Sequence, residues 1–90
     1  MLFAWDLEKA AENLRKHGVP FEEAETVFDD PLSKTLLDPD HSEGEERYLE
    51  IGYSSRRRLI LVSYTERQGR VRIISARRVT RKERRSYEER

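Results

Sequence analysis

The sequence of 90 residues contains no cysteine and no long hydrophobic segment. The absence of cysteine excludes disulfide bonds, thiolate zinc sites and thiol catalysis. The apolar runs are short, with five residues in Met1–Trp5 and four in Leu59–Val62, whereas a membrane-spanning helix needs about 20. The segment Met1–Asp6 has no basic residues ahead of an apolar stretch, so no signal peptide is expected. We therefore expect a cytoplasmic protein that makes no membrane contact.

Large apolar residues are scarce, and the formal net charge is zero. Leu, Ile, Val and Phe account for 21 of the 90 residues, just above the roughly 20% below which strongly charged chains are disordered. Because the net charge is zero, we expect a folded chain, and its length predicts a single domain over residues 1–90. A chain of this size buries only about 60–65% of its unfolded surface. The core is therefore expected to be small, and a stable partner would help it.

Charged residues, in contrast, are abundant and unevenly distributed. Residues 1–50 carry 14 acidic and 5 basic side chains, a net charge of −9, whereas residues 51–90 carry 4 and 13, a net charge of +9. The basic half contains 12 arginines and one lysine, Lys82. The planar guanidinium group of arginine suits bidentate phosphate contacts and stacking on bases, which indicates a nucleic-acid partner. The alternative is a solvated charged surface that the acidic half neutralises.

Local patterns predict a small α+β fold. Helices are predicted from the N-cap Asp6 to Gly18, over about 20–28, and from Thr80, where a capping box with Glu83 begins a helix that runs to about residue 89. Polar residues 38–44 predict a loop. The predicted order is a short strand, two helices, an antiparallel sheet of three to four further strands and a C-terminal helix, with the helices on one side of the sheet. The predicted strands span residues 2–5, 33–37, 46–53, 58–65 and 70–77.

The first predicted helix has one apolar stripe. Leu7, Ala10, Ala11 and Leu14 follow one another at the spacing of a single helix face, so this face is expected to meet the core. The aromatic residues of the first predicted strand, Phe3 and Trp5, are also expected in the core rather than stacked on bases.

Several short motifs, in their order and spacing, resemble the BrnT family of toxins. The resemblance covers essentially the whole chain, and it departs from the family at Pro20, where the family often has a small polar residue. The matching segments are Phe3-Ala4-Trp5-Asp6, Asn13-Leu14-Arg15-Lys16-His17-Gly18-Val19, Phe21-Glu22-Glu23-Ala24, Asp30-Pro31, His41-Ser42, Glu45-Glu46-Arg47, Ile51-Gly52, Tyr64-Thr65, Arg72-Ile73-Ile74-Ser75-Ala76-Arg77 and Glu83-Arg84-Arg85-Ser86-Tyr87-Glu88.

The resemblance implies a fold related to the RelE-like ribonuclease toxins, and a toxin of a bacterial type II toxin–antitoxin pair that cleaves RNA and arrests growth. It also implies a cognate BrnA-type antitoxin, a DNA-binding protein. This partner would neutralise the toxin in a hetero-oligomer and bind operator DNA with it, so that the two repress their own operon.

RNA cleavage without a metal requires a base for the 2′-hydroxyl proton, a cation for the charged phosphorane and an acid for the leaving oxygen. No cluster of carboxylates or histidines has convincing metal-ligand spacing, and His17 and His41 are 24 residues apart. A mechanism without a metal or another cofactor is therefore favoured.

Arg77 is the first candidate for phosphate binding. Alternation along the last predicted strand assigns Arg77 to the face of Val71 and Ile73, and Arg72, a second candidate, to the opposite face. A charge beside the core at the end of a strand is often positioned for a ligand. The alternative for both arginines is a solvated side chain or an ion pair, for example with Glu46 or Glu50.

Glu46 and Arg47 begin a predicted strand on opposite faces, so only one of them can face a given site. Glu46 is a candidate general base and Arg47 a candidate RNA contact, and the alternative for Glu46 is an ion pair with an arginine of the sheet. Histidine is the side chain type suited to proton transfer near neutral pH, so His17 and His41 could each act as acid or base. The alternatives are capping of the helix dipole for His17 and a solvent-exposed loop position for His41. The sequence does not decide which group is the general base.

Arg84 and Tyr87 lie three residues apart on the last predicted helix and share a face. The resemblance implies catalytic roles for both, since RelE-like toxins often have arginine and tyrosine near the C-terminus at the RNA. Packing of Tyr87 against the sheet is the alternative. Lys16, within the resemblance, and Arg67, in the turn before the last strand, are candidate RNA contacts, with an ordinary surface position as the alternative.

The leading interpretation is a metal-independent endoribonuclease toxin. One alternative is a non-enzymatic module that binds an antitoxin and, through it, DNA. Another is a catalytically weak paralogue that is kept for its repressor complex. All three would bind RNA in a salt-dependent way, so cleavage rather than binding distinguishes them.

Overall fold

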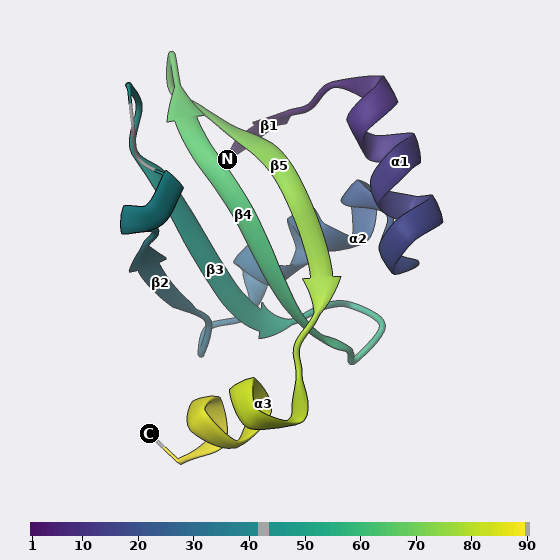
Figure 1. Ribbon diagram of the computed structural model, residues 1–90, viewed down its shortest axis with the longest axis vertical. Coiled ribbons are helices and arrows are strands. Elements are labelled where there is room, and N and C mark those ends of the chain that lie inside the picture. Colours follow the sequence, from purple (N-terminus) through teal and green to yellow (C-terminus); the bar gives the residue numbers. More distant parts are fainter. Residues whose placement is uncertain (42–43, 90) are drawn as a thin grey trace.

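The computed structural model describes residues 1–41 and 44–89 and contains a five-stranded sheet with three α-helices (Figure 1). This confirms the predicted α+β class. Ser42 and Glu43, in the predicted loop 38–44, lie outside the described residues. None of the described helices is long and apolar enough to cross a membrane. In chain order the elements are β1 (Leu2–Ala4), α1 (Leu7–His17), α2 (Phe21–Thr26), the 3₁₀ helix η1 (Val27–Asp29), β2 (Lys34–Leu37), the 3₁₀ helix η2 (Pro39–His41), β3 (Arg47–Tyr53), β4 (Leu59–Arg67), β5 (Arg70–Arg78) and α3 (Arg81–Glu88).

The sheet is mixed, with the strand order β1-β5-β4-β3-β2. The four strands β2 to β5 pair antiparallel with their neighbours, as predicted. β1 pairs parallel with β5, so that Phe3 lies opposite Val71. The expectation of one antiparallel sheet is therefore wrong at this edge. β1 reaches β5 through two helices and three strands rather than a hairpin, so no turn dictates its direction.

One face of the sheet packs against α1 and α2. Phe3 meets Phe28 edge to face at a centroid distance of 5.3 Å, and Trp5 meets Phe21 at 5.9 Å, so both aromatic residues of the N-terminal segment pack in the core as predicted. The buried residues of this core are Val19, Phe21, Ala24, Val27, Ile60, Val62, Tyr64, Val71, Ile73 and Ala76.

The helix α1 begins and ends where the sequence predicts but buries a different face. Asp6 accepts hydrogen bonds from the amides of Glu8 and Lys9, and Gly18 ends the helix at a φ of +70°. The predicted apolar stripe holds only in part as a core face, because Ala10 packs against the core whereas Leu7 and Leu14 are 80% and 49% exposed. The buried residue of α1 is polar.

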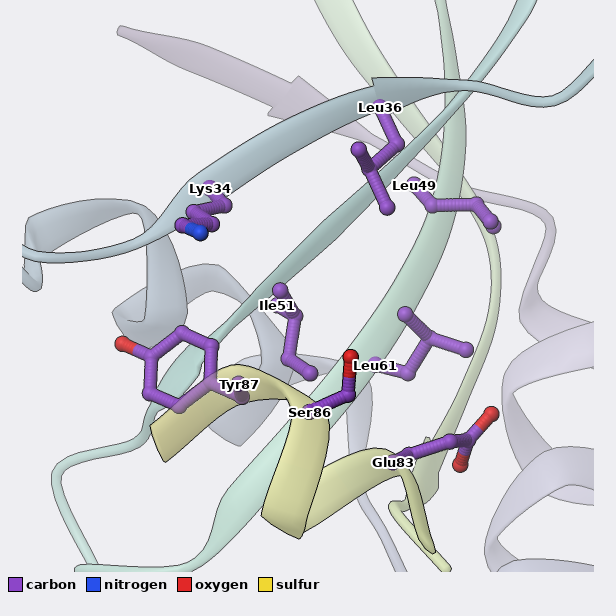
Figure 2. Close-up of a pocket in the computed structure, with 8 residues that line it drawn as sticks. All are labelled: Lys34, Leu36, Leu49, Ile51, Leu61, Glu83, Ser86 and Tyr87. Carbon is purple, nitrogen blue, oxygen red and sulfur yellow. The ribbon is translucent and has the colours of Figure 1, made fainter. Parts of the chain in front are cut away.

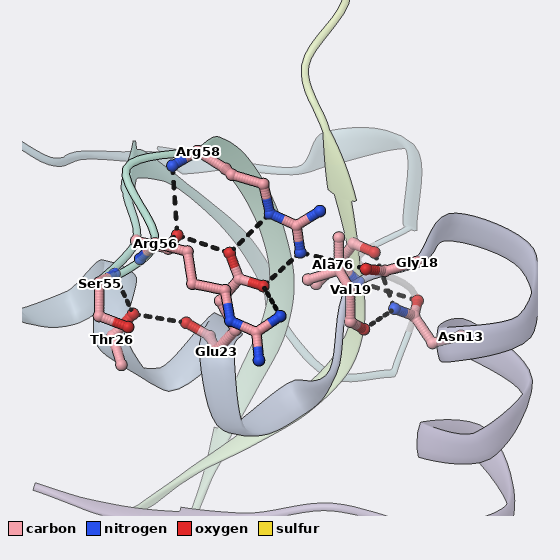
Figure 3. Close-up of polar contacts among 10 residues, drawn as sticks. Asn13, Gly18, Val19, Glu23, Thr26, Ser55, Arg56, Arg58 and Ala76 are labelled. Atoms are coloured by element: carbon pink, nitrogen blue, oxygen red, sulfur yellow. Dashed lines mark hydrogen bonds and ion pairs between the residues drawn. The ribbon is translucent and has the colours of Figure 1, made fainter.

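That residue, Asn13, bonds to the edge of β5 (Figure 3). Its amide nitrogen donates to the carbonyl oxygens of Ala76 and Val19, at 2.8 and 2.9 Å, and its oxygen accepts from the Ala76 amide at 3.0 Å. β1 pairs with β5 only as far as Arg72. Beyond that point Asn13 takes the hydrogen-bonding role of a strand, which explains why α1 approaches the sheet through an asparagine.

A buried ion pair ties α2 to the turn between β3 and β4 (Figure 3). The Glu23 side chain is 2% exposed and accepts hydrogen bonds from both Nε and Nη2 of Arg58 and from Oγ of Ser54. Arg58 Nη2 also donates to the carbonyl oxygen of Gly18 at 3.1 Å. The bonds from Arg58 lower the pKa of Glu23 despite its burial.

The helix α3 packs against the opposite face of the sheet. It begins with the predicted capping box, in which Thr80 Oγ1 accepts from the Glu83 amide and Glu83 Oε1 accepts from the Thr80 amide. Tyr87 is buried with Ile51 and Leu59. The expectation that all helices lie on one side is therefore wrong. β4 is apolar on both faces, so it supports a helix on each side.

Candidate active site

In the described part of the chain, α3 lies against only one end of the second sheet face, near the last residues of β3 and the first of β4 (Figure 1). The rest of this face, called the open face below, carries polar and basic side chains of β3, β4 and β5. Among the described ion pairs, those joining the acidic and basic halves are at Glu23, on the helix-covered side, and at Glu45. Ion pairs between the acidic residues 1–50 and the basic residues 51–90 therefore do not engage all the arginines of the open face.

A β-bulge decides which residues of β5 reach the open face. Ser63 pairs with Ser75, but the next residue, Tyr64, pairs with Ile73, so Ile74 is an extra residue in β5. Ile74 and Ser75 consequently line the same cavity although they are adjacent in sequence. A bulge of this kind inverts the alternation of all residues that follow it.

The bulge corrects the predicted position of Arg77. Strict alternation assigns Arg77 to the side of Val71 and Ile73, with Arg72 on the other side. In the structure Val71 and Ile73 are in the core beneath the helices, whereas Arg77 lies opposite Leu61 and lines a cavity of the open face. Arg72 also lies on the open face, so the two arginines share it.

The cavity on the open face has a volume of about 320 Å³ and brings together two cationic side chains. Arg47 comes from β3 and Arg77 from β5, on either side of the central strand β4. Two arginines from different strands that line one cavity offer a site suited to a phosphate. The lining residues are Asp38, His41, Arg47, Leu49, Leu61, Ser63, Ile74, Ser75 and Arg77.

Glu83 of α3 holds the guanidinium group of Arg77. Arg77 Nη1 donates to Glu83 Oε1 and Nη2 donates to Oε2, each at 2.8 Å. This bidentate contact raises the pKa of Arg77 and holds the pKa of Glu83 at about 2, below the 4.5 usual for glutamate. The side chains are 38% and 35% exposed, so solvent reaches the pair. The carboxylate sits against Arg77 in the planar, bidentate geometry that a phosphate would use.

A histidine and an aspartate complete the polar wall of the cavity. His41 Nδ1 lies 3.0 Å from Asp38 Oδ2, and the His41 side chain is 64% exposed. A carboxylate on one ring nitrogen orients the imidazole and leaves the other nitrogen for proton transfer. Asp38 was not among the predicted site residues. Its spacing from His41 across a proline turn is a local signal, but the approach of this turn to β5 is visible only in the fold.

Glu46 and Arg47 point to opposite sides of the sheet, as alternation predicts. Arg47 lines the cavity. Glu46 Oε2 instead accepts a hydrogen bond of 2.7 Å from the Tyr48 hydroxyl, and Tyr48 packs against the core under the helices. The structure therefore does not bring the Glu46 carboxylate to the cavity.

Arg67 and Arg72 lie at the other end of the open face. Together with Ala4, Gln68 and Arg70 they line a second cavity of about 290 Å³. Arg67 Nη2 also pairs with Glu45 at 2.9 Å, and both side chains are partly exposed. These arginines extend the basic surface away from the Arg47–Arg77 cavity.

Two other predicted residues lie on α1, which covers the opposite face of the sheet. Lys16 Nζ pairs with Glu12 Oε1 at 2.9 Å, and His17 is the exposed last residue of the helix. The structure does not bring either side chain to the cavity of Arg47 and Arg77.

Arg84 and Tyr87 share one face of α3, as their spacing predicts. Arg84 Nη1 donates to the Tyr53 hydroxyl at 3.2 Å, and the rings of Tyr53 and Tyr87 meet edge to face at 6.3 Å. Tyr87 is 8% exposed and donates its hydroxyl to the Leu32 carbonyl oxygen. Neither residue lines the cavity of Arg47 and Arg77, and Tyr87 serves the packing of α3.

The described side chains offer charge neutralisation and proton transfer at one place. Arg47 and Arg77 can face the oxygens of a phosphate, and the His41–Asp38 pair can exchange a proton with a neighbouring hydroxyl. Within residues 1–41 and 44–89, no three His, Asp or Glu side chains group as ligands of a metal ion would.

The fold is that of a known class of small toxin ribonuclease. The crystal structure of the ribonuclease toxin BrnT from Brucella abortus superimposes with a TM-score of 0.66 and 21% sequence identity, covering 90% of this chain and 100% of that one. Residues 5–83 match the family model described as the ribonuclease toxin BrnT of type II toxin–antitoxin systems. The chain therefore belongs to the BrnT family, which confirms the resemblance seen in the sequence. No curated protein matches it.

Proposed function

We propose that this BrnT-family chain is an endoribonuclease that cleaves RNA without a metal ion at the cavity between Arg47 and Arg77. The observation that carries the proposal is the convergence of these two arginines, from β3 and β5, on one cavity of the open face. Arg67 and Arg72 would continue the path of the RNA backbone along the same face. Arginine is suited to this task because its fork matches the oxygens of a phosphate.

The chemistry proposed is transesterification by the substrate's own ribose. A base removes the 2′-hydroxyl proton, the 2′-oxygen attacks the adjacent phosphorus, and the 5′-oxygen leaves with a proton from an acid. Arg77 and Arg47 would stabilise the negative charge that grows on the phosphorane oxygens. With Nδ1 donating to Asp38, Nε2 of His41 is the ring atom that can accept a proton. His41 is therefore the nearest candidate base to the two arginines, ahead of Glu46 and His17.

We further propose the biological role that membership of the BrnT family implies. RNA cleavage by the free toxin would arrest growth in the cytoplasm. A BrnA-type antitoxin would neutralise the toxin in a hetero-oligomer, and this complex would bind operator DNA and repress the operon. We also propose that the fold is related to that of the RelE-like ribonuclease toxins.

RNA cleavage by the purified protein in excess EDTA tests the proposal. We expect cleavage to continue and to leave 2′,3′-cyclic or 3′-phosphate ends together with 5′-hydroxyl ends. Loss of activity in chelator, restored by added magnesium, would contradict the metal-independent mechanism. A protein that binds its antitoxin but leaves RNA intact in every buffer would instead be the non-enzymatic co-repressor.

A further inference from the structure

The strand β2 forms one edge of the sheet and exposes leucines on both of its sides. Leu36 lies opposite Leu49, and Leu37 lies opposite Tyr48, so the two leucines point to opposite faces. They are 52% and 54% exposed. In the described part of the chain no further strand pairs with β2. Edge strands are usually protected by charge, proline or a bulge, and β2 has only Lys34 for this purpose.

An apolar groove runs from this edge along the base of α3 (Figure 2). Its volume is about 290 Å³, and its floor consists of four aliphatic side chains from three strands. Tyr87 and Ser86 of α3 form one wall (Figure 2). The floor is made of Leu36, Leu49, Ile51 and Leu61.

The groove is continuous with the candidate active site. Leu49 and Leu61 line both cavities. Glu83, which lines the groove, is the residue that holds Arg77. A chain that lies in the groove and continues past Leu61 therefore reaches the guanidinium group of Arg77. Such a chain would cover the surface proposed for RNA.

We infer that the antitoxin of this toxin adds an extended segment to the outer edge of β2, as a sixth strand of the sheet. Successive apolar side chains of this segment lie beside Leu36 in the groove and beside Leu37 on the opposite face. An acidic side chain of the same segment meets Lys34 of β2. The inference rests on the antitoxin partner that the family has, and not on the cleavage chemistry.

Two observations favour an added strand over other occupants. A helix lying in the groove would cover Leu36 but leave Leu37 exposed on the other face, whereas a strand paired with β2 covers both. A nucleobase is held by stacking on aromatic or guanidinium planes. The groove floor is aliphatic instead, which suits leucine, isoleucine or valine side chains.

The test measures binding of the purified cognate antitoxin to the toxin by calorimetry, without RNA. The double variant Leu36→Glu/Leu37→Glu is expected to raise the Kd on the order of 100-fold, since two apolar contacts at the centre of an interface are replaced by charges. The matched control is Leu7→Glu/Leu14→Glu, which changes two exposed leucines of α1 and should alter the Kd by less than about threefold. Circular dichroism melting verifies that both variants fold.

Hydrogen exchange on the wild-type toxin gives a second readout that needs no variant. Antitoxin binding should slow exchange at the amides of residues 34–37 more than at α1. An unchanged Kd for the β2 variant, or protection confined to α1, would overturn the inference. A β2 variant that loses RNA cleavage or self-association while keeping its antitoxin affinity would also overturn the inference. In that case RNA, or a second copy of the chain, would bind in the groove. Since binding is measured without RNA, an inactive toxin that still binds through β2 contradicts only the proposed cleavage.

Discussion

Two arginine–carboxylate pairs lie on opposite faces of the sheet and differ chiefly in burial. On the helix-covered face, the Glu23 side chain is 2% exposed and the Arg58 side chain 24% exposed. On the open face, Glu83 and Arg77 are 35% and 38% exposed. Both arginines contact their carboxylate through two nitrogens. The same chemistry therefore serves folding at one place and remains within reach of a ligand at the other.

The surroundings of the two pairs reinforce this contrast. Arg58 also bonds Gly18, and Ser54 also bonds Glu23, so that three segments of the chain meet at the buried pair. Arg77 instead lines a cavity open to solvent. We expect changes at the buried pair to alter stability, and changes at the open pair to alter activity.

Replacement of Arg77 by alanine is expected to produce the largest effect. If Arg77 stabilises the phosphorane, Arg77→Ala lowers kcat for RNA cleavage by about 10²–10³-fold, the loss typical of a removed charge-stabilising donor. The free energy of unfolding should fall by at most about 1 kcal/mol, because the pair with Glu83 is partly exposed and solvent-screened. Single-turnover cleavage and urea unfolding measure the two effects.

The control for Arg77 is Arg78→Ala, which removes the same charge from the adjacent, exposed residue. Arg78 lies opposite Ile60, a residue of the helix-covered core, so it does not face the cavity. Equal losses in the two variants would indicate a general charge effect and would contradict a specific role for Arg77.

Replacement of Glu23 by alanine tests the buried member of the comparison. Removing one partner of a buried ion pair costs about 3–5 kcal/mol. We expect about 3 kcal/mol for Glu23→Ala, at the low end of that range, because Arg58 keeps some contact with solvent. Urea unfolding measures the loss, and cleavage per folded molecule should stay near wild type. The exposed neighbour Glu22 provides the control, since Glu22→Ala should leave the unfolding midpoint unchanged. Similar midpoints for the two variants would mean that Glu23 contributes no more than a surface charge.

Replacement of Asn13 by alanine tests the other polar junction of the helix-covered face. Asn13→Ala leaves the amide and carbonyl of Ala76 without their present partner at the edge of β5. A buried polar group left unsatisfied costs about 1–3 kcal/mol, and we expect a loss in this range in urea unfolding. Hydrogen exchange at the Ala76 amide should accelerate as well. A stable variant with unchanged exchange at this amide would show that water replaces the side chain at no cost.

The sequence predicted the elements whose signals are local. Asp6 and Gly18 mark the ends of α1 because capping and left-handed backbone depend on neighbouring residues. The capping box of Thr80 and Glu83 identified the start of α3 for the same reason. The order of the motifs was enough to identify the family.

Features that depend on contacts distant in sequence could not be predicted. The bulge at Ile74 has no unambiguous pattern, since Ile73 and Ile74 can each occupy a core position. The burial of Asn13 follows from the length of β1, which leaves Ala76 without a neighbouring strand. Asp38 joins the candidate site only because η2 folds back toward β5. Of these features, the bulge changes the side of the sheet that Arg77 faces, whereas the other two change which residue is buried and which residue joins the site.

The smallest expected effect is the pH dependence of the free energy of unfolding that comes from the exposed pair Arg77–Glu83. This dependence also contrasts most clearly with the buried pair Arg58–Glu23. The pKa of Glu83 is about 2 in the folded chain, below its usual 4.5, so its contribution to stability is present above pH 4.5 and is lost as the pH falls toward 2. After allowance for solvent screening, we expect this contribution to be about 1 kcal/mol. The free energies of unfolding of the wild type and of Glu83→Gln should therefore differ by that amount at pH 6 and become equal near pH 2. Titration of Glu23 occurs in both proteins and cancels in the difference. A gap that stays constant with pH would mean that the Glu83 charge does not stabilise the fold, and that Arg77 is held by geometry alone.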